Sequence, residues 1–139
     1  MTTVAAAQAV IRARLEAQLP ALSFKWQNES FIVPNTAAPF AHVELIVEGM
    51  EFAGFGGGRF ANLQRTTGRI EAQVMVRANT AVATGYATAE DIAAVFRSFR
   101  DEDISCFTAE VFPEFGRTED GNYNHVATVI CDLHFDKIG

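Results

Sequence analysis

The stretch Arg69-Ile-Glu-Ala-Gln-Val-Met-Val-Arg77 alternates apolar and polar residues, with Met75 as the one exception. Successive side chains of a β-strand point to opposite faces, so this alternation predicts a strand with one buried face. The residues of that face are Ile70, Ala72, Val74 and Val76. A half-buried strand of this kind is typical of an antiparallel sheet that is covered on one side only.

Four other segments carry strand patterns. They are Leu22–Trp26, His42–Glu48, Cys106–Phe112 and Tyr123–Asp136. We expect Pro113 to end the third of these, because proline donates no ladder hydrogen bond, and residues 115–122 to form a polar turn. The segment Gly49–Gln64 holds five of the ten glycines, which argues against regular structure throughout it.

Two segments have helical periodicity. The first carries Val4, Ala7, Ile11, Leu15 and Leu19 at helical spacing. We expect this helix to start near Thr2 or Thr3 and to end at Pro20. A second helix is predicted with Thr88 as its N-cap and with Arg97 and Arg100 in its last turn. Its expected buried stripe is Ile92, Val95, Phe96 and Phe99.

The order of these elements predicts an α+β fold in which two helices pack on one face of a mostly antiparallel sheet. The chain has 139 residues, without internal repeats or a long linker. This length suits one core, so residues 1–139 are predicted to form a single domain.

Composition narrows the classes of function. The net charge is −6 and the arginines are scattered, whereas affinity for a phosphate backbone needs clustered cations. We therefore expect no tight nucleic-acid binding by one subunit. The sequence also predicts neither a signal peptide nor a membrane span. Cys106 and Cys131 are too few and too far apart for a disulfide framework, and are expected to be buried, reduced thiols.

Motifs for chemistry are weak. The run Gly54-Phe-Gly-Gly-Gly58 leads toward another strand, whereas a phosphate loop opens a helix. Asp132, His134 and Asp136 share one strand face and have the spacing of metal ligands, but a solvated polar face gives the same pattern. No nucleophile elbow is present. We expect no catalytic residue, no cofactor and no metal site, and hence no enzyme.

Several landmarks together resemble a family of phage tail-terminator-like proteins, also described as a phage-related domain of unknown function. In chain order they are Ala9–Glu16, Phe24–Phe31 with Trp26, Pro39–Leu45, Arg65–Val76, the second helix and His125–Phe135. Each motif is loose, and the specificity comes from their order over nearly the full length. The Gly-rich insertion Met50–Leu63 departs from the family pattern.

The resemblance implies a structural virion protein at the neck end of the tail, assembled in the host cytoplasm. A homohexameric ring would cap the tail tube, contact the major tail tube protein and offer a docking surface to neck or head-completion proteins. DNA would pass through its lumen without sequence-specific binding. The alternatives are a head–tail adaptor, a minor tail protein, or a small ligand- or nucleic-acid-binding module of a prophage. A gene-transfer particle is an equally suitable source.

A ring needs two different surface patches on each subunit. Exposed aromatic side chains suit such contacts better than they suit a monomer surface. We therefore predict that the Gly-rich loop supplies an interface. The candidate interface residues are Phe52, Phe55, Arg59, Phe60 and Arg65.

Overall fold

The computed structural model describes residues 3–31, 38–54, 63–97, 99–100, 104–117 and 122–138. The side chains of residues 51–54, 63, 137 and 138 lie outside that description. The described elements, in chain order, are α1 Val4–Gln18, β1 Ser23–Trp26, β2 Phe40–Gly54, β3 Leu63–Arg77, α2 Val82–Phe96, β4 Ile104–Arg117 and β5 Tyr123–Ile138.

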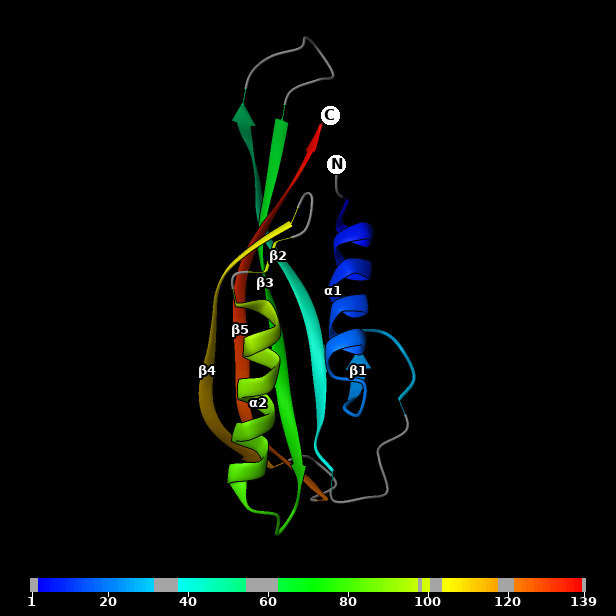
Figure 1. The fold of residues 1–139 in the computed structure, drawn as a ribbon, viewed down its shortest axis with the longest axis vertical. Helices are drawn as coiled ribbons and strands as arrows, with labels where there is room; N and C mark the ends of the chain where they lie inside the picture. The colour runs from blue at the N-terminus through cyan, green and yellow to red at the C-terminus, as the bar shows by residue number, and fades with distance from the viewer. Residues whose placement is uncertain are drawn as a thin grey trace.

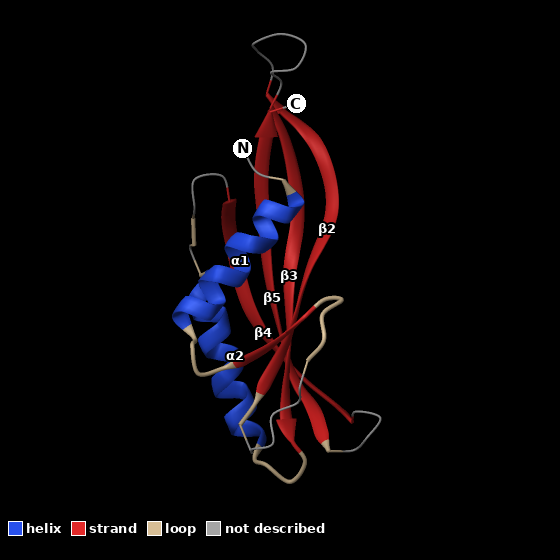
Figure 2. Ribbon diagram, turned by 90° about the vertical axis from the view of Figure 1, so that its right-hand side faces the viewer, coloured by secondary structure: helices blue, strands red, loops and turns tan. Residues whose placement is uncertain are grey.

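The strands form one sheet in the order β1-β2-β3-β5-β4. The short strand β1 runs parallel to β2, and every other neighbouring pair is antiparallel. Both helices pack on the same face of this sheet (Figure 2). β1 and β4 lie at opposite edges, and α1 begins toward the same end of the long strands at which β5 ends (Figure 1). The predicted α+β fold is confirmed.

Helix α1 forms as its sequence predicts. The hydroxyl of Thr3 caps it by accepting a hydrogen bond from the Ala6 N–H at 3.1 Å. Ala7, Ile11 and Leu15 make up its buried stripe. The helix ends before Pro20, whose ring cannot continue the hydrogen-bonded ladder.

Helix α2 begins at Val82, six residues before the predicted cap, so the prediction of Thr88 as N-cap was wrong. The helix ends at Phe96, so the prediction that Arg97 and Arg100 lie in its last turn was also wrong. Thr88 lies within the helix and its hydroxyl donates to the Thr84 carbonyl at 3.0 Å. The extra turn forms because Gly85 lets the helix approach the sheet closely. A Cβ there would lie 2.3 Å from Val126 and 2.9 Å from Val76.

The strands are longer than the sequence predicted. β2 continues to Gly54 and β3 already begins at Leu63, so part of the Gly-rich segment is strand. β4 runs through Pro113 to Arg117, so the prediction that Pro113 ends the strand was wrong, and residues 115–117 of the predicted polar turn are strand. β4 tolerates the proline because it is an edge strand, and no described strand pairs with its outer side at Pro113.

The core lies between the helices and the sheet. Phe96 from α2 and Phe135 from β5 are its largest fully buried side chains, and the predicted face of β3 is buried throughout. Neither helix in the described part of the chain has the length and apolarity needed to cross a bilayer.

Candidate interaction surface

The sheet face turned away from the helices, called the open face here, is occupied by paired polar side chains. Arg69 lies 3.4 Å from Glu48 and 2.9 Å from Glu71. His42 Nε2 lies 3.4 Å from Glu44 Oε1. These pairs are partly exposed, so they contribute little to stability. This group holds one arginine and three carboxylates, so its carboxylates outnumber its arginine.

The edge strand β4 is different because it exposes three phenylalanines. Phe107, Phe112 and Phe115 have 52%, 41% and 65% of their surface exposed. Phe107 stacks against His134 of β5 with ring centroids 4.6 Å apart. We call these three residues the β4 patch. Exposed aromatic side chains are enriched where one protein contacts another, so the edge strand that carries all three is a candidate contact surface.

Local irregularities explain why these rings are exposed. The pairing of β4 with β5 shifts between Cys106 and Thr108, and again between Pro113 and Gly116. Phe107 and Phe115 fall within these two shifts, where an extra residue breaks the alternation of faces. The sequence offered a usable indication here, since a proline inside an apolar alternating run favours an edge strand.

The opposite edge has another composition. β1 has four residues and exposes Ser23 and Lys25, while Trp26 is buried. Arg12 of α1 lies over the Trp26 ring at 5.1 Å and binds Glu29 at 2.6 Å. In the described part of the chain no acidic side chain pairs with Lys25. The two edges of the sheet therefore differ. The β4 edge carries exposed aromatic and acidic side chains, whereas the β1 edge is short and carries the unpaired Lys25.

The predicted interface residues are only partly placed. Phe55, Arg59 and Phe60 lie outside the described residues, and Phe52 is described only as backbone of β2, paired with Gln64. Arg65 lies on β3, where its guanidinium donates to both carboxylate oxygens of Asp136 at 2.9 and 3.2 Å. That ion pair joins β3 to β5 and occupies the side chain within its own sheet.

The three residues with metal-ligand spacing do share the open face, as their alternation predicts. Asp136 binds Arg65, and Asp132 accepts a hydrogen bond from the Thr108 hydroxyl at 3.2 Å. Burial, and then the positive charge of Arg65, lower the pKa of His134. No cluster of three potential metal ligands occurs among the described residues.

Cys106 and Cys131 are buried and form no disulfide, as expected. They lie on neighbouring strands, and the hydrogen bond with Cys106 together with burial raises the pKa of Cys131. Reactive cysteines need partial exposure and a lowered pKa, so Cys131 is a packing residue. The Gly-rich run lies between β2 and β3 in the chain, and these are antiparallel neighbours, so the next described element after it is a strand. The described residues therefore do not show the strand followed by a helix N-terminus that a phosphate loop requires.

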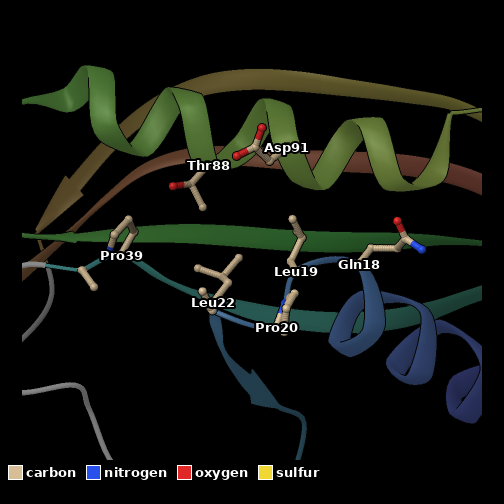
Figure 3. A pocket seen from close by; sticks show the side chains of 9 residues that line it. Gln18, Leu19, Pro20, Leu22, Pro39, Thr88 and Asp91 are labelled. Atoms are coloured by element: carbon tan, nitrogen blue, oxygen red, sulfur yellow. The ribbon is translucent and has the colours of Figure 1, made fainter.

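Two hollows lie on the helix-covered side. The larger, of about 310 Å³, lies between the end of α1, the start of β2 and the middle of α2. Figure 3 shows Leu19, Pro20 and Leu22 on one side of it, with Thr88 and Asp91 across from them. The smaller, of about 210 Å³, is lined by Ile11, Trp26, Val43 and Leu45 among others. Neither gathers the group of convergent charged residues that a catalytic pocket needs.

Comparison with known proteins supports the fold and adds no activity. No protein-family model and no curated protein matches the sequence. Fourteen chains of solved structures match the fold. One of them is 17% identical, with a TM-score of 0.56 over 91% of this chain and 94% of that chain. Its name states no function, and a likeness at this identity shows a shared fold alone.

Proposed function

We propose that this protein is a structural subunit that works by assembling into a closed ring, a tail-terminator-like component of a phage tail. The observation that carries the proposal is the exposed β4 patch on one edge of a sheet whose other edge is unlike it. A subunit with two non-identical, complementary surfaces associates head to tail, and a fixed rotation between copies closes a ring.

Chemistry of the two edges supports this reading. Aromatic side chains that are already exposed and held on a strand lose little freedom on binding, which makes them effective anchors. A free edge strand with apolar side chains is also prone to pair with another chain unless a partner covers it. A ring covers both edges in every subunit at once.

The order of landmarks along the chain supports the more specific assignment. It resembles tail-terminator-like proteins, whose ring would cap the tail tube and receive a neck or head-completion protein. A head–tail adaptor ring would use the same edges, and only its neighbours in the particle would differ. The scattered arginines and the net charge of −6 agree with a lumen that lets DNA pass without gripping it.

Sedimentation velocity and electron microscopy of the purified protein, alone and mixed with a major tail tube protein from the same source, test the proposal. We expect rings, either free or at tube ends. A protein that stays monomeric in both conditions over the micromolar range would contradict the proposed function.

A small-ligand-binding module is the second candidate, and the larger hollow beside Thr88 and Asp91 favours it. Its volume falls at the lower end of the range for ligand pockets. A thermal-shift screen with metabolite mixtures distinguishes the two functions. A ligand that raises the Tm of the wild type but not of Leu22→Trp, which fills the hollow, would favour the module.

A further inference from the structure

We propose that in the ring the outer edge of β4 of one copy lies beside the outer edge of β1 of the next, with Lys25 facing the acidic residues that flank Phe112. This inference rests on the proposed function and names the two surfaces that the ring would join. Its partner is a second copy of this chain.

One row of paired residues crosses the sheet from edge to edge. Its members are Lys25, His42, Gln73, Thr128 and Phe112. Lys25 therefore ends the row at one edge and Phe112 ends it at the other. Copies related by rotation about an axis along the strands keep these ends at the same height. The row then continues from Phe112 of one copy to Lys25 of the next.

The charges on the two edges are complementary. Glu110 lies two residues before Phe112 and Glu114 two residues after it, and both are exposed. Glu114 is on the open face, because it accepts a hydrogen bond from Thr128 at 3.2 Å. Lys25 is on that face too, since it alternates with the buried Trp26. Diagonal neighbours across a strand pair are within reach of long side chains, so Lys25 would meet both carboxylates.

Strand direction agrees with this junction. β1 runs parallel to β2, and three antiparallel steps lead from β2 to β4, so β1 and β4 point in opposite directions. A β4 strand beside the β1 strand of the next copy would extend the antiparallel order. A stagger of two residues, in either sense, would bring Lys25 directly opposite Glu110 or Glu114, so the attraction survives a tilt of the strands.

Charge reversal tests the junction in the full-length protein, under whichever condition assembles the wild type. Each charge reversal is made in a Glu114→Gln background, which leaves Glu110 as the one carboxylate flanking Phe112 and serves as the reference for assembly. In this background Lys25→Glu and Glu110→Lys each place like charges across the junction, and each should raise the dissociation constant of assembly by about tenfold or more. The double variant Lys25→Glu/Glu110→Lys should assemble again, because opposite charges meet at every junction. Asp91→Lys, at an exposed position of α2, changes the net charge as Glu110→Lys does and should assemble like the wild type.

A mixture of the two single variants provides a further test of the junction. Neither single variant can form a favourable junction with itself, but each offers the other a complementary edge on both sides. An equimolar mixture should therefore form rings of alternating subunits if the copy number is even. Circular dichroism and melting curves of each variant confirm that both are folded, which is expected because Lys25 and Glu110 are exposed.

The outcomes separate the two proposals. If both single variants assemble as well as the wild type, or the double variant fails to recover, the β4–β1 junction is wrong while the ring itself still stands. If the wild type never assembles, the proposed ring function itself is contradicted.

Discussion

Phenylalanine occupies two contrasting environments in this protein. In the core, Phe96 and Phe135 are each 1% exposed, packed between the helices and the central strands. On the edge, Phe115 is 65% exposed and only the sheet margin supports it. The same side chain therefore serves stability in one region and, by our proposal, association in the other. The difference lies in its position relative to the sheet.

The largest expected effect separates these two environments directly. Phe96→Ala should lower the free energy of unfolding by about 3–5 kcal/mol, because it removes a fully buried ring and leaves a cavity. Phe112→Ala should change it by less than about 0.5 kcal/mol, as is usual for surface positions. Denaturant unfolding of each variant under monomeric conditions provides the measurement. Similar losses for both would show that the β4 patch belongs to the core.

A second effect concerns how closely α2 approaches the sheet. Alanine is a better helix former than glycine by about 1 kcal/mol, so Gly85→Ala would stabilise an exposed helix. Here the new methyl group would overlap the buried side chains of Val76 and Val126. We expect a net loss of about 1–3 kcal/mol, the usual cost of overpacking a core. A rise in Tm would mean that α2 lies further from the sheet than described.

Periodicity was sufficient for the architecture. The alternation from Ile70 to Val76 and the stripe from Ile92 to Phe96 predicted the faces that are buried, because burial on one side forces these periods. The boundaries failed where tertiary contacts override local preference. From the sequence alone Gly85 indicates a break in the helix, because its close approach to Val126 is a tertiary contact that only the structure shows.

The candidate surface was less predictable. A period of two cannot reveal Phe107 or Phe115 as exposed, because both lie where the pairing of β4 slips. Which strand forms the edge depends on the order of the sheet, and that order is set by long-range pairing. The prediction for the Gly-rich loop stays a prediction, since Phe55 and Phe60 lie outside the described residues. Arg65 proved to be engaged with Asp136.

A third and smaller effect is expected from the ion pair between Arg65 and Asp136, which joins β3 to β5. Arg65 and Asp136 have side-chain exposures of 37% and 24%, so solvent screens their attraction. A double-mutant cycle with Arg65→Met and Asp136→Asn should give a coupling energy of about 0.5–1 kcal/mol, typical of a partly exposed pair. Ring assembly should stay unchanged, because the pair joins two strands of one sheet. Loss of rings in Arg65→Met would instead return Arg65 to the interface.

The smallest effect arises at His134, where the central strand β5 touches the edge ring of Phe107. Burial lowers the pKa of His134, and its Nδ1 is buried without a hydrogen-bond partner among the described residues. The unfolded chain, with a histidine pKa of about 6.5, then binds more protons than the folded chain as the pH falls through that value. The free energy of unfolding should therefore decrease on acidification, starting near the unfolded pKa and levelling off below the folded one.

The variant His134→Gln isolates this contribution, because it removes one imidazole and leaves the other two histidines in place. Unfolding curves between neutral pH and pH 5 should fall less steeply for the variant than for the wild type. Parallel curves would mean that the imidazole is as well solvated in the fold as in the unfolded chain. In that case Phe107 would not shield the imidazole of His134, and the Phe107 ring would be free to turn outward. The exposed area of the β4 patch would then be larger, which would favour its interpretation as a contact surface.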